Sequence, residues 1–173
     1  MLSLMIKPSI KYSVLCGVFL TGLFFVSIAF GSNPLIEVRH LIFDLAIFFL
    51  FIFFAGKEYK DVGNAGILHF WQGISLGIIV FIPAVIIFSL TIYIILELNP
   101  TLIDGYKEAA KALQESQREL FLEVYSEETL QKQIREVDLI SSIDLVLKTF
   151  WKKLFAGFLV TPVAAIILRK KTN

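Results

Sequence analysis

ILHFWQGISLGIIVFIPAVIIFSLTIYIIL, residues Ile67 to Leu96, contains no Asp, Glu, Lys or Arg. One helical crossing of a bilayer core needs about 20 mostly apolar residues. Three further stretches are long and apolar enough for a crossing, and they lie at Tyr12–Phe30, Leu35–Ala55 and Phe150–Leu168. The sequence therefore predicts an all-α integral membrane protein with four transmembrane helices.

The composition agrees with this class. Hydrophobic residues make up 57% of the chain and charged residues only 18%, whereas soluble domains carry about 25% charged residues. We expect one membrane domain over residues 1–173. Its crossings are predicted at 12–31, 35–56, 67–96 and 149–168, with an extracytoplasmic helical insert at 99–142 between the third and fourth.

The first apolar stretch has an alternative interpretation as a cleaved signal peptide. Lys7 and Lys11 precede it, and Ala29-Phe30-Gly31 resembles a small-residue cleavage site. Apolar cores of signal peptides run to about 7–15 residues, and Tyr12–Phe30 is longer. A retained helix is favoured, while cleavage would leave three crossings in the same orientation.

Basic residues flanking the predicted crossings indicate the orientation. Lys7 and Lys11 precede the first helix, Lys57 and Lys60 follow the second, and 169–171 ends the chain with Arg-Lys-Lys. Short cytoplasmic segments are enriched in Lys and Arg, and four crossings put these three segments on one side. We expect a bacterial inner (plasma) membrane protein with cytoplasmic N- and C-termini.

The predicted insert is acidic and helical. Asn99-Pro100-Thr101 is a helix-start signal, and 101–125 holds strong helix formers with Gly105 as its breaker. Ser126-Glu127-Glu128 then predicts the start of a second helix, with a serine N-cap and acids in the first turn. These two amphipathic helices either form a contact surface for the bundle or a partner protein, or merely link the third and fourth crossings.

The segment 56–77, GKEYKDVGNAGILHFWQGISLG, resembles domain-of-unknown-function family 4199, a family of Bacteroidota inner-membrane proteins. The resemblance implies a fold and a membrane location but no activity and no catalytic residues. The family pattern is a basic-x-Tyr-basic-Asp turn after the second helix, followed by a Gly and a Phe that lead into a glycine-marked third helix. This chain departs from the family by carrying His69 and Trp71. The residues that match the family pattern are Lys57, Tyr59, Lys60, Asp61, Gly66, Phe70, Gly73 and Gly77.

Asp44 is the main candidate for a functional residue, because it is the only charge between Leu41 and Ala55. An acid inside a membrane span is by default a functional hypothesis. His40 lies one turn earlier on the same predicted face, and Lys152 or Lys153 lies within reach on the fourth helix. An ion or proton relay is one interpretation. The other is a polar tie from Asp44 to Ser89, Thr91, Tyr93 or Lys153.

Pairs of small residues predict close helix packing. Gly73 with Gly77, and Gly157 with Thr161, are spaced so that helix backbones can approach in lipid. They serve packing within the bundle or a homodimer face. Aromatic residues at the predicted ends of the helices are typical of membrane-interface belts, namely Tyr12, Tyr59, Trp71 and Trp151.

Enzymatic function is not expected. The sequence contains no phosphate loop, nucleophile elbow, zinc-protease motif or nucleotide fingerprint, and we expect no cofactor and no metal. Cys16 is interpreted as apolar filler.

The leading hypothesis is a non-catalytic accessory or scaffold subunit of an envelope complex. The alternative is a small proton, cation or solute transporter or channel using Asp44. The expected partners are the lipid bilayer and either a membrane protein or further copies of the chain, but not nucleic acid.

Overall fold

The computed structural model describes residues 2–31, 33–36 and 39–169, and within them the chain is helical with no β-strand. This confirms the predicted all-α class. Four of the described helices are long and apolar enough to cross a membrane. The elements are α1 (Leu2–Ala29), α2 (Arg39–Glu58), the π-helical turn η1 (Tyr59–Gly63), α3 (Phe70–Leu98), α4 (Thr101–Ser116), α5 (Arg118–Leu122), α6 (Glu127–Asp138) and α7 (Ser142–Leu168).

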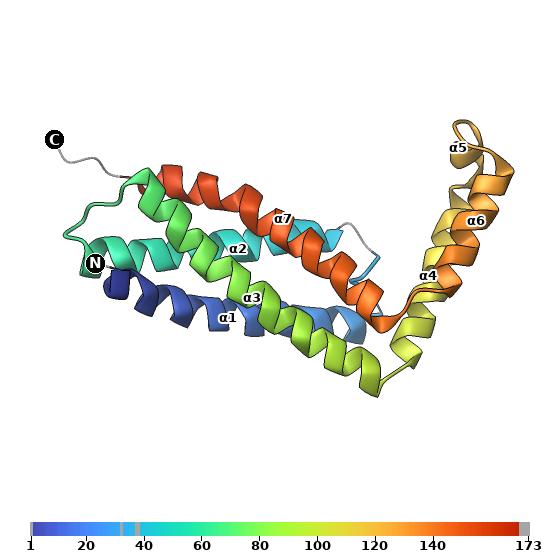
Figure 1. The fold of residues 1–173 in the computed structure, drawn as a ribbon, viewed down its shortest axis with the longest axis horizontal. Helices are drawn as coiled ribbons and strands as arrows, with labels where there is room; N and C mark the ends of the chain where they lie inside the picture. The colour runs from blue at the N-terminus through green and yellow to red at the C-terminus, as the bar shows by residue number, and fades with distance from the viewer. Residues whose placement is uncertain (1, 32, 37–38, 170–173) are drawn as a thin grey trace.

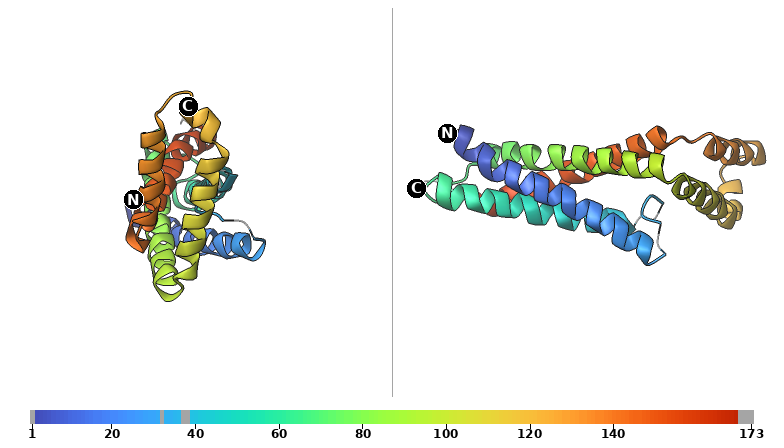
Figure 2. Two further views of the ribbon diagram at one scale, coloured as in Figure 1. Left: turned by 90° about the vertical axis from the view of Figure 1, so that its right-hand side faces the viewer. Right: turned by 90° about the horizontal axis from the view of Figure 1, so that it is seen from below.

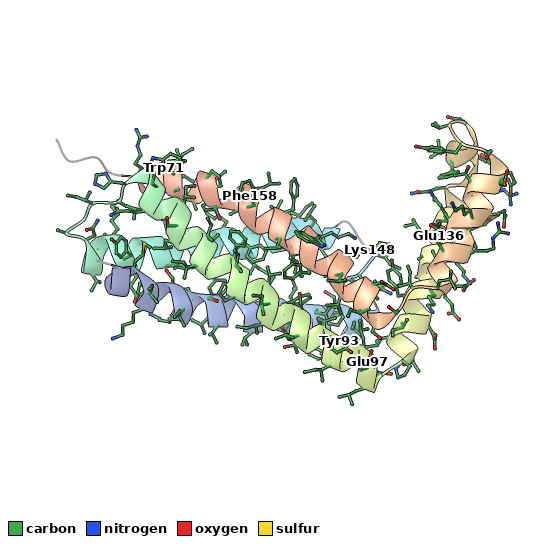
Figure 3. The ribbon with its side chains drawn as sticks, viewed as in Figure 1. Trp71, Tyr93, Glu97, Glu136, Lys148 and Phe158 are labelled. Atoms are coloured by element: carbon green, nitrogen blue, oxygen red, sulfur yellow. The ribbon has the colours of Figure 1, made fainter. Side chains whose placement is uncertain are left out.

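The long helices α1, α2, α3 and α7 form a bundle (Figure 1). Helix α3 packs against α1 on one side and α7 on the other, and α2 closes the ring between α1 and α7. Side chains such as Phe48, Val80 and Ala156 are fully buried in its centre. Large apolar side chains such as Leu90 and Phe158 are exposed on the outside of the bundle, and Figure 3 shows Phe158 on α7. Helices that are apolar all round are typical of membrane spans.

The two ends of the bundle differ in what they carry. The first described residues, η1 and Arg169 lie at one end, which we call the termini end (Figure 1). The connection between α1 and α2 and the helices α4–α6 lie at the other, which we call the insert end. At the termini end Lys11 pairs with Glu58 at 2.7 Å, which ties α1 to α2.

Two helices begin earlier than the expected crossings. Helix α1 starts at Leu2 rather than at residue 12, and α7 starts at Ser142 rather than at residue 149. The start of α7 is fixed by a capping box, in which the backbone N–H of Ser141 donates to Asp144 Oδ2 at 3.0 Å. The first turns of α7 therefore continue the crossing beyond its apolar stretch.

Helices α4, α5 and α6 form a hairpin that stands off the insert end of the bundle (Figures 1 and 2). The predicted cap at Ser126 is confirmed, since its Oγ accepts from the Thr129 backbone N–H at 3.3 Å. The expected single helix over 101–125 is interrupted at Gln117. The hydroxyl of Ser116 donates to the Leu113 carbonyl at 2.8 Å, and such side-chain bonds compete with the helical ladder.

Ion pairs and a small apolar contact hold the hairpin together. Arg118 donates to Glu115 at 2.8 Å and to Glu127 at 2.7 Å, which fastens α5 between α4 and α6. Lys111 of α4 pairs with Asp138 of α6. Leu130 of α6 is fully buried. The hairpin therefore makes its own internal contacts.

Candidate functional site

The side chains of Asp44 on α2 and Lys153 on α7 form a buried ion pair. Lys153 Nζ donates to Asp44 Oδ1 at 2.5 Å, and the two residues are 6% and 7% exposed. Since α2 and α7 are neighbours in the ring, this contact crosses one helix interface of the bundle. Burial of either charge alone costs several kcal/mol, so each partner makes the burial of the other tolerable.

An aromatic ring completes the surroundings of the Lys153 ammonium. Lys153 Nζ lies 4.3 Å from the centroid of the Phe88 ring on α3, a cation–π geometry. Phe88 in turn meets Phe24 of α1 edge to face, with 6.1 Å between ring centroids. The ion pair therefore contacts α3 directly through Phe88, and Phe88 connects it to α1.

The ion pair lies in the half of the bundle toward the insert end, since Asp44 and Lys153 both precede the midpoints of α2 and α7. Asp44 is five residues after Arg39, where α2 begins, which corresponds to about 7.5 Å along the helix axis. A charge off the bilayer centre is less costly than one at the midplane, where an Asp costs about 3 kcal/mol. This position explains how α2 can carry Asp44 and remain a membrane helix.

A partly enclosed cavity of about 200 Å³ adjoins the ion pair. His40 and Asp44 of α2 line it together with Thr149, Lys152 and Lys153 of α7. Its remaining lining is apolar and comes mostly from α1 and from the Pro34–Ile36 segment. The structure therefore brings His40, Asp44 and Lys153 to one cavity, as the sequence analysis grouped them.

The other polar residues considered as partners of Asp44 have different surroundings. Thr91 Oγ1 donates to the Ile87 carbonyl of its own helix at 2.8 Å. Tyr93 is exposed on α3 (Figure 3). Ser89 Oγ is buried and has no hydrogen-bond partner among the described residues. Among the named alternatives, Lys153 is the partner of Asp44.

The small residues predicted for helix packing meet across the α3–α7 interface. A Cβ added to Gly73 would lie 2.7 Å from Ala165 Cβ, and one added to Gly77 would collide with the Thr161 side chain. A Cβ added to Gly157 would lie 2.6 Å from the Phe81 ring. Both small-residue pairs therefore lie in the contact between α3 and α7. The spacing in the sequence identified each pair, but it did not show that the two pairs lie in the same helix contact.

The residues that resemble the family pattern form the turn at the termini end. Lys60 Nζ donates to the Leu168 carbonyl at 3.1 Å, which ties the turn to the end of α7. Gly66 has φ +76° and donates from its N–H to the Lys60 carbonyl at 2.8 Å. Lys57 and Asp61 are exposed, and Phe70 is the first residue of α3.

Tyr59 corrects one expectation of the sequence analysis. It was assigned to an interfacial belt, yet it is only 2% exposed and belongs to the core. Tyr59 follows Phe48, Ile52 and Ala55 at α-helical spacing, and these three residues are also buried. It therefore continues the buried face of α2, and the π-helical turn starts there. Trp71 and Trp151, from the same predicted belt, are exposed, and Figure 3 shows Trp71 at the start of α3.

The fold and the site define a four-helix membrane-protein class with a buried intramembrane ion pair. The sequence model of the family described as "Protein of unknown function (DUF4199)" matches residues 11–170, so the chain belongs to that family. The match includes α1 from Lys11 onward, the whole of α2, α3 and α7, and the hairpin. No curated protein and no solved structure matches the chain.

Proposed function

We propose that the chain is a non-catalytic accessory or scaffold subunit of a complex in the bacterial inner membrane. In this proposal both termini face the cytoplasm and the α4–α6 hairpin lies outside. The orientation rests on the basic residues at the termini end, which include Lys11, Lys57 and Lys60, because short cytoplasmic segments favour Lys and Arg.

The observation that carries this proposal is the exposed apolar tip of the hairpin. Large side chains around α5 are open to water, although a surface helix usually buries such residues. The hairpin also carries nine acidic against five basic residues over 101–141. A protein partner with an apolar patch rimmed by basic residues would complement this tip. The exposed apolar residues are Leu113, Leu120, Leu122, Val124 and Tyr125.

Site-specific photo-cross-linking in native membranes tests the proposal. A photoreactive side chain at Leu120 should yield one discrete cross-linked protein, whereas the same group at lipid-facing Leu90 should not. Charge reversal at Glu119 and Glu123, which flank the tip, should weaken the Leu120 cross-link. The proposal would be contradicted if the probes at Leu120 and Leu90 gave the same cross-linked products. It would also be contradicted if the chain purified without a partner in every mild detergent.

A second candidate function is a small transporter or channel for protons, cations or a small solute. The cavity beside Asp44 and His40 is the observation in its favour. Against it stands the 2.5 Å contact with Lys153, which already satisfies the Asp44 carboxylate. Proteoliposomes with the purified chain should show flux that Asp44→Asn abolishes. Absent flux, or flux unchanged by Asp44→Asn, would exclude this function.

A further inference from the structure

The cavity beside the ion pair has two chemically different walls. Leu20, Leu23 and Phe24 of α1 form an apolar wall, while Lys152 and Thr149 of α7 supply polar atoms on the opposite side. A pocket with apolar walls and a few convergent polar groups is the usual form of a small-molecule site. An amphiphilic molecule matches this division better than a fully polar or fully apolar one.

The charge of the lining favours an anionic head group. Asp44 and Lys153 neutralise each other through their direct contact. Lys152 forms no ion pair with any residue that the structure describes, and Lys148 lies one turn before it on α7. Among the described residues that line the cavity, Lys152 therefore supplies the positive charge that no ion pair neutralises. A carboxylate or a phosphate would be its complement, through charge-assisted hydrogen bonds.

The rim of the cavity gives access from the lipid. Phe155 on α7 is 61% exposed, and Leu41 on α2 is also exposed, yet both line the cavity. Exposed apolar residues on membrane helices face acyl chains. A molecule dissolved in the half of the bilayer at the insert end could therefore enter sideways, between lipid and bundle.

The volume limits the ligand to one chain. A cavity of roughly 150 Å³ can hold benzene, so about 200 Å³ accommodates a segment of one alkyl chain and not two chains side by side. We propose that this cavity binds an anionic amphiphile with a single alkyl chain. Its carboxylate or phosphate head lies at Lys152 and its chain against Leu20, Leu23 and Phe24. This inference is independent of the proposed scaffold function.

Photo-labelling of the full chain in neutral detergent tests this inference. Three probes carry the same diazirine-bearing chain: a fatty acid, a lysophosphatidic acid and an uncharged monoacylglycerol. One or both anionic probes should label residues 20–24 and exceed the uncharged probe by about tenfold, as one charge-assisted hydrogen bond implies. The stronger anionic probe identifies the head group as carboxylate or phosphate.

Matched variants separate the cavity from general attraction to lysines. Lys152→Gln should lower anionic labelling about tenfold, whereas Lys148→Gln, on the same helix but outside the cavity, should leave it within about twofold. Leu23→Trp, which fills the apolar wall, should lower labelling by all three probes. Thermal unfolding of each variant reports whether it is folded.

Three results would overturn the inference. The first is labelling outside residues 20–24, and the second is equal labelling of the Lys152→Gln and Lys148→Gln variants. The third is stronger labelling by the uncharged probe than by the anionic ones. Absence of labelling by both anionic probes in the folded wild-type chain would do the same.

Discussion

Lys153→Met offers a direct test of the buried ion pair. The substitution keeps an unbranched side chain of similar length but removes the charge that faces Asp44 at 2.5 Å. An ion pair broken by loss of one partner typically destabilises a protein by about 3–5 kcal/mol, since the remaining charge is buried and uncompensated. The lost cation–π contact with Phe88 adds about 0.5–2 kcal/mol.

Protonation limits the part of this loss that comes from the unpaired charge. An ordinary carboxyl group with a pKa near 3.9 can be neutralised at pH 7 for about 4 kcal/mol, so Asp44 without Lys153 can take up a proton at that cost. We therefore predict that Lys153→Met lowers the free energy of unfolding by about 3–5 kcal/mol at pH 7. The deficit should shrink as pH falls toward 4, because the proton then becomes available at lower cost.

Two further variants isolate the charge from the packing. Lys148→Met, on the exposed face of the same helix (Figure 3), should change stability by less than about 0.5 kcal/mol. The double variant Asp44→Leu with Lys153→Met should recover most of the loss, because apolar replacement of a whole buried pair is often neutral or stabilising.

Equilibrium unfolding in mixed micelles of mild detergent and dodecyl sulfate, followed by circular dichroism, measures these differences. The reasoning would be refuted by a Lys153→Met variant no less stable than Lys148→Met, or by a double variant less stable than either single one.

Three other predictions concern packing, capping and titration. Gly77→Ala should destabilise the bundle by about 1–3 kcal/mol, because the added Cβ meets Thr161. Gly105→Ala should stabilise the protein by about 0.4–1 kcal/mol, because no atom lies within 4 Å of the added Cβ. The same unfolding assay compares the two variants. Ser126→Ala should cost about 1 kcal/mol of α6 stability, measured as faster amide exchange confined to the hairpin. A hydrogen bond from Gln131 lowers the pKa of Glu127. The contribution of the Glu127 carboxylate to hairpin stability is therefore complete above the ordinary pKa of glutamate and is lost as pH falls through the lowered pKa. In that pH range, amide protection of α6 should decline in the wild type but not in Glu127→Gln.

The fold class could be predicted because hydrocarbon imposes a simple requirement on sequence. Runs such as 67–96 are long, apolar and uncharged, and only a helix satisfies its backbone groups in lipid within one segment. The start of α7 at Ser142 could not be located in the same way. It depends on the capping box of Ser141 with Asp144, and the amphipathic turns that follow lack the hydropathy of the crossing.

The candidate site could be predicted only in part. A lone acid in an apolar run singled out Asp44, and helix spacing placed His40 beside it. The choice of Lys153 over Ser89 or Thr91 as its partner required the ring order of the helices, which places α2 beside α7.

Local geometry accounts for two features that the sequence analysis missed. Tyr59 is buried because it continues the helical face of Phe48, Ile52 and Ala55 that packs into the bundle. Gly17 lets α1 approach α3, since an added Cβ would lie 3.0 Å from Ile87. Ser13 and Thr21 are small residues four positions before and after it, a spacing that the sequence analysis did not single out. The cavity also required coordinates, because its lining residues come from separate helices.

Cysteine labelling of spheroplasts tests the proposed four-crossing orientation most directly. Cys16 is fully buried, so the native chain should give no background with a membrane-impermeant maleimide. We predict that Ser116→Cys, on the hairpin, is labelled in intact spheroplasts, and that Asp61→Cys, in η1, is labelled only after the membrane is permeabilised. Labelling of both cysteines from the same side, or of Asp61→Cys alone before permeabilisation, would contradict a bundle threaded with both termini in the cytoplasm.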